Sequence, residues 1–435
     1  MAPAEDLDDE NVSLVDKDLA FSTPNPNDNG GGETAPLVKA TVRAPFDFRE
    51  DPQSCSFLPS LYGGSSVKLN TEFFGDPSWP RILLFVHGVC ASAETWSIQN
   101  VARTCASQNW RLAVLELEGH GLSGGRKGLI GASWELCVKQ GVRFCKHALK
   151  VDRFQKKKLA KTEADTDTPA PRFAIGGSSL GGALASYASQ EMATEDTQSY
   201  LFAGTLLFSP AVGVDPSVVP PKHIVGALSV ASWIVPSVGI QGATPTEDPT
   251  SYNCPSWTKR NFVGAWPLGT SKLLLDATST ILPYAIETGS LNLLVPPPTT
   301  ARAATNSAIM CTTTTARTDE EEGTRKKRPK RTIVVISGVS DPVVPIEAVH
   351  NFVDGMKRIA RKRLVNEPKN SKDDDDDAIA GADATIELIE IEKGDHGLLS
   401  QSDVDPLIGK DKKKAMATTI EHVVLFLKRC EAIDG

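Results

Sequence analysis

The sequence lacks an excess of positive charge and an apolar segment at its N-terminus. Its 435 residues include 46 Lys and Arg against 54 Asp and Glu, which gives a formal net charge of −8. Because nucleic-acid binding requires a basic face that neutralises phosphates, this balance argues against a nucleic-acid partner. The acidic start Met1–Asp6 is followed by no apolar stretch, so we expect neither a signal peptide nor a transit peptide.

Cysteine pairs and metal-ligand spacings are missing as well. The eight cysteines stand at positions 55, 90, 105, 137, 145, 254, 311 and 430. We expect reduced thiols in a cytoplasmic protein that needs no metal or other cofactor. Cys90 has two interpretations, a reactive thiol beside a functional turn or the more common small buried side chain.

Long hydrophobic runs are scarce. The stretch His223–Ile240 contains no Asp, Glu, Lys or Arg, but it includes Pro236, two glycines and three serines. It barely reaches the length of a membrane-spanning helix. We therefore expect a buried or interfacial helix that touches a membrane from one side, and no transmembrane helix.

A glycine- and serine-rich turn is the most informative feature that is present. Residues 176–182 read Gly-Gly-Ser-Ser-Leu-Gly-Gly, which contains the pattern G-x-S-x-G centred on Ser179. An apolar run at 172–175 precedes it and a helix-like run at 182–188 follows it. A serine on such a sharp strand-to-helix turn exposes its hydroxyl at the carboxyl edge of a sheet.

Two further strand-like runs end at residues of matching chemistry. The run 332–338 precedes Asp341, and the run 385–391 precedes His396. Singly, these residues could be a turn serine, a turn aspartate and a loop histidine. In the order Ser, Asp, His they predict a nucleophile, an orienting acid and a general base. Asp395 cannot replace Asp341, because adjacent side chains point apart.

These motifs resemble the α/β-hydrolases, and within them the monoacylglycerol lipase and lysophospholipase branch, also called serine aminopeptidase-like hydrolases. The closer likeness rests on residues 115–125, LELEGHGLSGG, which resemble D-x-x-G-H-G-x-S-x-G with Glu116 in place of Asp. Another departure is Ser178, where many relatives carry His. The likeness covers about residues 65–295 and 331–430.

The resemblance implies an α/β-hydrolase fold, with a mostly parallel central sheet, helices on both faces and an inserted cap. It also implies an oxyanion hole made by two backbone N–H groups. The His-Gly turn after the apolar run 81–86 supplies the first donor, that of Val89, and the residue after the nucleophile supplies the second, that of Leu180.

The pattern of strands and helices agrees with this fold class. Strands are expected near 67–74, 81–86, 112–116, 172–176, 201–208, 332–337 and 385–391, and helices near 133–150, 182–192, 344–362 and 412–432. We expect a disordered segment over 1–40, core over 41–210 and 332–435, a cap over 211–295, a disordered insertion over 296–331 and an acidic insertion over 366–384. The basic cluster 325–331 and the run Asp373–Asp377 are interpreted as solvated charge.

The expected function is hydrolysis of a carboxylic ester through an acyl-enzyme. By resemblance the substrate is a lipid ester, monoacylglycerol or lysophospholipid. Three alternatives stay open: an acyltransferase with the same triad, a proline iminopeptidase-like peptidase that binds its amine with Glu247 and Asp248, and a non-catalytic receptor. The H-x-x-x-x-D pattern formed by His147 and Asp152, as in glycerolipid acyltransferases, is set aside as a chance match. Nothing in the sequence predicts the oligomeric state.

Overall fold

The computed structural model describes eleven stretches of the chain. They are residues 46–47, 68–93, 95–131, 133–160, 171–194, 200–214, 219–240, 266–294, 331–366, 384–399 and 410–432. Several predictions lie outside them: the 1–40 segment, Glu247 and Asp248, nearly all of the 296–331 and 366–384 insertions, and the Asp373–Asp377 run.

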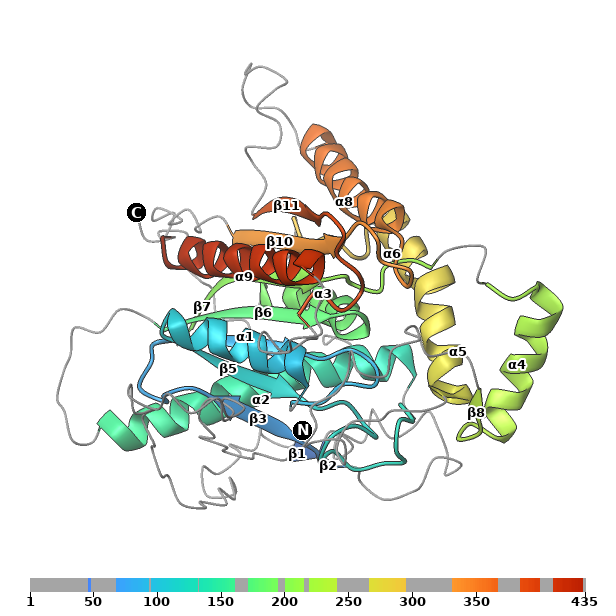
Figure 1. Ribbon diagram of the computed structural model, residues 1–435, viewed down its shortest axis with the longest axis horizontal. Coiled ribbons are helices and arrows are strands. Elements are labelled where there is room, and N and C mark those ends of the chain that lie inside the picture. Colours follow the sequence, from blue (N-terminus) through green and yellow to red (C-terminus); the bar gives the residue numbers. More distant parts are fainter. Residues whose placement is uncertain are drawn as a thin grey trace, which may run out of the picture.

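A seven-stranded sheet forms the centre of the molecule, with strand order β11-β10-β7-β6-β4-β5-β3 (Figure 1). All neighbours run parallel except β3, which pairs antiparallel with β5. The strands are β3 Thr71–Phe74, β4 Arg81–Val86, β5 Trp110–Leu115, β6 Arg172–Ser178, β7 Leu201–Phe208, β10 Arg331–Gly338 and β11 Ala384–Ile391. The expected strand 67–74 is interrupted at Asn70, and its first part, β2 (Lys68–Leu69), pairs with β1 (Phe46–Asp47).

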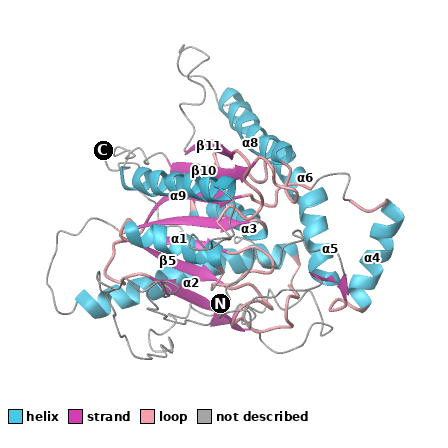
Figure 2. Ribbon diagram, viewed as in Figure 1, coloured by secondary structure: helices cyan, strands magenta, loops and turns pink. Residues whose placement is uncertain are grey.

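Helices cover both faces of this sheet (Figure 2). One core cluster lies under α2 (Trp134–Ala160), α3 (Leu180–Met192) and α8 (Ile346–Asn366). A second cluster on the other face lies under α1 (Trp96–Ser107) and α9 (Lys410–Glu431). The central strand β4 is buried and apolar from Ile82 to Val86, because parallel sheets are covered from both sides. The predicted α/β class is therefore confirmed.

The chain between β7 and β10 contributes a group of helices at one end of the molecule (Figure 1). We refer to residues 211–295 as the proposed cap. Its helices are α4 Lys222–Ile234, α5 Leu268–Asp276, the π-helical turn Ala277–Ile281 and α6 Leu282–Thr288, and Gly239–Ile240 (β8) pairs with Trp266–Pro267 (β9). Among the described residues, no helix combines the length and hydropathy needed to cross a bilayer.

Candidate active site

Ser179 occupies a strained turn between β6 and α3. Its backbone has φ 52° and ψ −123°, a combination that costs a non-glycine residue about 1–3 kcal/mol. Backbone hydrogen bonds hold it there: the Ser179 N–H donates to the oxygen of Phe208 at 3.0 Å, and the N–H of Ala211 donates to the Ser179 oxygen at 2.9 Å. The side chain is only half-buried. The fold thus presents a serine hydroxyl at the carboxyl edge of the sheet.

The glycines around the serine are required by close backbone contacts. A Cβ atom on Gly177 would lie 2.2 Å from the oxygen of Gly181, and one on Gly181 would lie 2.1 Å from the oxygen of Val86. Both distances are far below van der Waals contact. The outer glycines of the G-x-S-x-G pattern therefore let β6, α3 and β4 approach closely enough to form the turn.

Asp341 and His396 are hydrogen-bonded to each other. Nδ1 of His396 lies 2.8 Å from Oδ2 of Asp341, and the carboxylate side chain is fully buried. The other carboxylate oxygen accepts the N–H groups of Val343 at 2.8 Å and Val344 at 2.9 Å. Because a carboxylate can only accept, His396 carries its proton on Nδ1 and keeps Nε2 as a base.

The acid is held in its ionised form. Burial by itself would raise the pKa of Asp341, but the charge of His396 and the hydrogen bonds from His396, Val344 and Val343 outweigh burial, so the pKa lies below its ordinary value. Asp395 faces elsewhere: its carboxylate accepts the N–H of Gly397 and lies 3.3 Å from Nζ of Lys412. The structure therefore brings Asp341, and not Asp395, to the histidine.

The three predicted residues follow strands that end at the same edge of the sheet. Strand register aligns Ser178 with Phe208, Phe208 with Ile336, and Ile336 with Ile389. The acid and histidine loops are tied directly, because the N–H of Ser340 donates to the oxygen of Gly394 at 2.9 Å. Ser179, Asp341 and His396 thus project from neighbouring loops above β6, β10 and β11.

The two predicted oxyanion donors flank the serine. A Cβ atom on Gly88 would lie 3.1 Å from Cβ of Ser179, so the turn after β4 packs against the nucleophile. Val89 follows Gly88 in that turn. Leu180 is the first residue of α3, where a backbone N–H has no partner within the helix. The structure thus places Val89 and Leu180 in the two segments that adjoin Ser179, and their role as oxyanion donors stays a prediction.

Glu116, the residue that departs from the resembled motif, is a buried loop anchor. Its carboxylate accepts the N–H of Ala93 at 3.0 Å, the N–H of Leu122 at 2.6 Å and Nδ2 of Asn70 at 2.8 Å. A Cβ atom on Gly121 would lie 2.0 Å from this carboxylate, so a glycine there makes room for the longer acid. Glu116 therefore has a structural role in these loops.

Two histidines to which the sequence assigned no role join the same loops. His87 and His120 are fully buried, with ring centroids 5.5 Å apart. Both lie beside glycines in loops at the carboxyl edge of the sheet. The His-Gly pairs in the sequence indicate these loops, but they do not predict which atoms the rings contact. Burial raises the pKa of the Cys90 thiol to about 12, which disfavours a reactive thiolate.

The H-x-x-x-x-D pattern belongs to a buried ion cluster. Asp152 pairs with Nη1 of Arg111 at 2.6 Å and accepts the hydroxyl of Tyr200 at 2.6 Å. Lys156 completes the cluster at 2.6 Å. These contacts join α2 to β5 and the start of β7, so Asp152 serves structure and takes no part in the candidate site.

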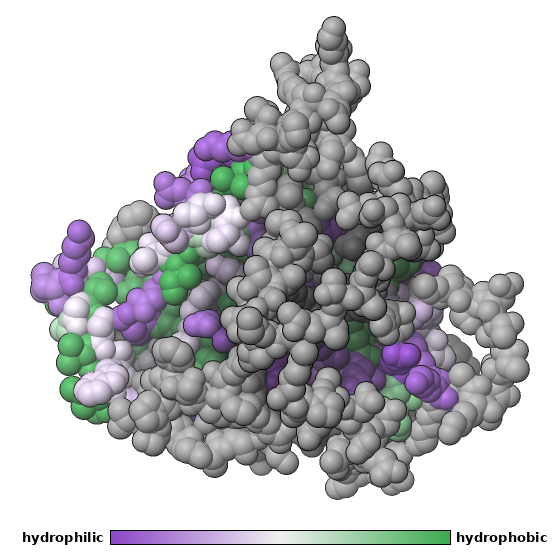
Figure 3. Space-filling model, turned by 180° about the vertical axis from the view of Figure 1, so that it is seen from behind, coloured by the Kyte–Doolittle hydropathy of each residue, from purple (hydrophilic) through white to green (hydrophobic). Residues whose placement is uncertain are grey.

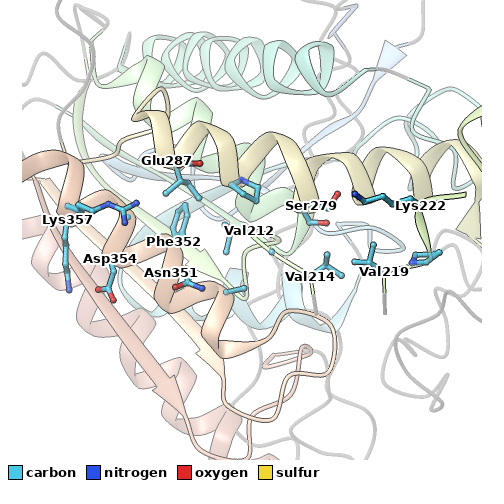
Figure 4. Close-up of a pocket in the computed structure, with 18 of the residues that line it drawn as sticks. Val212, Val214, Val219, Lys222, Ser279, Glu287, Asn351, Phe352, Asp354 and Lys357 are labelled. Atoms are coloured by element: carbon cyan, nitrogen blue, oxygen red, sulfur yellow. The ribbon is translucent and has the colours of Figure 1, made fainter. Parts of the chain in front are cut away.

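A cavity of about 1230 Å³ adjoins the site between α6, α8 and the segment after β7. Figure 4 shows Phe352 and Val212 between Lys357 at one end and Lys222 at the other. Val212 directly follows Ala211, the residue bonded to the Ser179 backbone. Ser179, Asp341 and His396 are absent from its described lining, so this cavity adjoins the loops of the three candidate residues without including them.

Helix α4 exposes apolar side chains to solvent. Of its 13 residues only Ser232 is buried, while Val230, Trp233 and Ile234 are about 60% exposed. Seen from behind, this end of the molecule carries hydrophobic residues at its surface (Figure 3). The first part of the uncharged stretch His223–Ile240 therefore forms a surface helix with exposed apolar side chains.

The solved structures that the chain matches share little of its sequence. Solved structures similar in fold include a monoacylglycerol lipase from Paleococcus ferrophilus (15% identity, 82% of this chain and 99% of that chain, TM-score 0.44). A second is a soluble variant of the monoglyceride lipase of Saccharomyces cerevisiae (10% identity, 87% of this chain and 97% of that chain, TM-score 0.47). A third is Est1E from Butyrivibrio proteoclasticus with ferulic acid bound (14% identity, 86% of this chain and 100% of that chain, TM-score 0.41). No curated protein sequence matches the chain.

The family model described as serine aminopeptidase, S33, matches residues 78–367. This range contains the His-Gly turn after β4, Ser179, the proposed cap and Asp341, and it covers more than half of the chain. The chain therefore belongs to the serine aminopeptidase S33 family of α/β-hydrolases.

Proposed function

We propose that this protein is a serine hydrolase that cleaves carboxylic esters of lipids through Ser179, His396 and Asp341. The observation that carries the proposal is the buried hydrogen bond between Asp341 and His396 at the sheet edge where Ser179 stands on a strained turn. Structural proteins rarely combine a strained exposed serine with an oriented histidine and an ionised acid.

The reaction proceeds in two balanced halves. Nε2 of His396 takes the proton of the Ser179 hydroxyl while its oxygen attacks the ester carbonyl, and the N–H groups of Val89 and Leu180 bind the oxyanion. The tetrahedral intermediate expels the alcohol, which receives the proton from His396. In the second half, Nε2 of His396 takes a proton from water while the water oxygen attacks the acyl-enzyme carbonyl. The second tetrahedral intermediate then releases the carboxylic acid, and His396 returns the proton to Ser179.

The adjoining cavity offers a place for the acyl chain. Its lining combines apolar residues, such as Val212, Val214 and Phe352, with charged residues of α8, such as Asp354 and Lys357, and it begins beside the backbone that holds Ser179. From Ala348 to Arg358 along α8 it extends by about 15 Å at the rise of an α-helix. An apolar chain of a monoacylglycerol or lysophospholipid suits this shape better than the compact amine end of a peptide.

Peripheral contact with a membrane is proposed through α4. Burial of Val230, Trp233 and Ile234 in the acyl region of a bilayer would remove their exposed apolar area from water. This contact would bring the proposed cap against the lipid phase in which the substrates dissolve.

Activity-based labelling with a fluorophosphonate, followed by a panel of esters, tests the function. We expect labelling of the wild-type protein at Ser179 and hydrolysis of long-chain glycerol or phosphoglycerol monoesters. The S33 family name also covers aminopeptidases, so aminoacyl amides belong in the panel. Hydrolysis of amides without esters would overturn the proposal in favour of a peptidase, and absence of labelling would favour a receptor. Acyl transfer to an added glycerolipid exceeding hydrolysis would favour the acyltransferase.

A further inference from the structure

The oxyanion turn and the loop after β5 exchange hydrogen bonds through two histidine rings. Nε2 of His87 lies 3.1 Å from the backbone nitrogen of Leu117, which donates to it. Reciprocally, Nε2 of His120 accepts the backbone N–H of Cys90 at 3.1 Å. Each loop therefore supplies the acceptor for a backbone donor of the other.

The second nitrogen of each ring fixes its tautomer. Nδ1 of His87 lies 2.6 Å from the carbonyl oxygen of Gly88, and Nδ1 of His120 lies 2.8 Å from that of Glu118. A carbonyl oxygen can only accept, so Nδ1 carries the proton in both rings and Nε2 is the acceptor. Burial lowers the pKa of His87 to about 3 and that of His120 to about 4, which keeps both rings neutral.

The bond from His87 acts on the peptide unit that contains the candidate oxyanion donor. The carbonyl of Gly88 and the N–H of Val89 belong to one trans peptide and point in opposite directions. The Gly88 oxygen accepts the Nδ1–H of His87 at 2.6 Å and, more weakly, the N–H of Ala91 at 3.4 Å, so the His87 bond is the shorter of the two that set the direction of the Val89 N–H. A hydrogen bond accepted by a peptide carbonyl also polarises its own N–H toward stronger donation.

The next residues along the turn are held from the other loop. Cys90 has a φ of 64°, a conformation that non-glycine residues avoid, and its N–H is taken by His120. The N–H of Ala93 is taken by Glu116. Gly88, at the start of the turn, packs tightly against Ser179, since an added Cβ atom would lie 3.1 Å from Cβ of Ser179. The turn is thereby clamped on one side by the nucleophile and on the other by the loop of residues 116–123.

We propose that His87 is a positioning residue that aims the Val89 N–H at the oxyanion, with His120 and Glu116 supporting the turn. This rests on the proposed function, because the oxyanion exists only during ester cleavage. The role belongs to the Nδ1–H of His87 and its bond to Gly88, while its Nε2 bond to Leu117 serves loop stability.

A matched pair of substitutions separates these two bonds. In His87→Asn the side-chain amide nitrogen can replace Nδ1 and keep the bond to Gly88, but the acceptor for Leu117 is lost. In His87→Gln the amide oxygen can replace Nε2 and keep Leu117, but the donor to Gly88 is lost. His87→Asn leaves the buried N–H of Leu117 without its acceptor, and His87→Gln leaves the Gly88 oxygen with only the N–H of Ala91, at 3.4 Å, as its donor. Both variants should therefore lose some stability to urea.

We expect the two His87 variants to differ in kcat. His87→Gln should lower kcat on a soluble ester by about 10- to 100-fold with little change in KM, since an oxyanion contact acts in the transition state. His87→Asn should retain kcat within about threefold of wild type. The rate of fluorophosphonate labelling should follow the same order. His120→Gln, which removes an Nδ1–H bond outside the Val89 peptide, should lose less kcat than His87→Gln.

Equal kcat in the two His87 variants, at equal folded fraction by near-UV circular dichroism, would overturn the positioning role. So would a larger loss in His87→Asn than in His87→Gln. Failure of the proposed function looks different, because the wild-type protein itself would then neither react with fluorophosphonate nor cleave esters.

Discussion

The side chain of His396 contacts the carboxylate of Asp341 across a loop junction, with Nδ1 and Oδ2 2.8 Å apart and only 11% of the histidine side chain exposed. The imidazole is thus fixed in one tautomer before any substrate arrives. Asp341→Asn replaces the acceptor by an amide that can present N–H to the ring and favour the opposite tautomer. We expect a folded protein whose kcat falls by about three to four orders of magnitude. Asp395→Asn is the matched control and should alter kcat little; a reversed order of the two effects would assign the acid to Asp395.

Ser179→Ala should abolish fluorophosphonate labelling and ester hydrolysis while keeping the fold. The hydroxyl is needed for the covalent step, but the backbone bonds to Phe208 and Ala211 do not involve it. Intact-protein mass spectrometry after incubation with the probe checks the result. Ser178→Ala is the control, because the neighbouring serine carries the same group, and labelling of Ser179→Ala would place the reactive serine elsewhere.

Filling the cavity should discriminate between substrates of different length. Ala348→Phe places a ring among the lining residues of α8, whereas Glu347→Phe adds the same ring at an exposed position outside that lining. We expect Ala348→Phe to reduce kcat/KM at least tenfold for long-chain monoacylglycerol, about the effect of a lost apolar contact of 1.4 kcal/mol. A butyrate ester should be cleaved nearly as by wild type. If both chain lengths suffered alike, the acyl chain would have to lie outside this cavity.

A charge on α4 should affect lipid in vesicles more than ester in solution. Val230→Asp and Ile234→Asp each put a carboxylate on the exposed apolar surface of the helix, where entry into a bilayer becomes costly. Co-sedimentation with phosphatidylcholine vesicles and hydrolysis of vesicle-borne substrate should both fall, with a soluble ester unaffected. Leu425→Asp, a similarly exposed leucine on α9, is the control. Undiminished vesicle activity in both α4 variants would remove the membrane role from this helix.

His87 and His120 should make the fold sensitive to mild acid. Each has a folded-state pKa below its ordinary 6.5, so the unfolded chain binds protons that the native state refuses. The contribution of the two neutral rings to the free energy of unfolding is fully present above about pH 6.5. It declines as the pH falls toward about 4, by roughly 1.4 kcal/mol per pH unit for each histidine. Asp341 has its depressed pKa below this window and contributes no loss within it. Urea unfolding at about pH 7, 6 and 5 measures the slope, which should become shallower by about half in His120→Asn.

Much of the fold followed from local pattern. The apolar runs before Ser179 and Asp341 are buried strands and the run before His396 is a half-buried edge strand, and all three end at the same edge of the sheet. Helix α1 was not predicted, although Ile98, Val101, Ala102 and Cys105 recur at helical spacing on its buried face. The contacts of His87 and His120 could not be predicted, because their partners are backbone atoms, which every residue possesses. Glu116 was noticed as a departure, but only the fold shows the three donors that its longer side chain reaches.

The turn at Ser179 depends on residues that are synthesised after it. Its strained backbone is held by Phe208 and Ala211, at the end of β7, and Ser209 is in turn bonded to Ile336 of β10. A nascent chain that has not yet added these strands lacks the bonds that keep the serine in its exposed conformation. If Ser179 is the nucleophile, as proposed, its presentation therefore requires that β7 and β10 have docked, and an incomplete chain cannot yet hold the serine in that conformation.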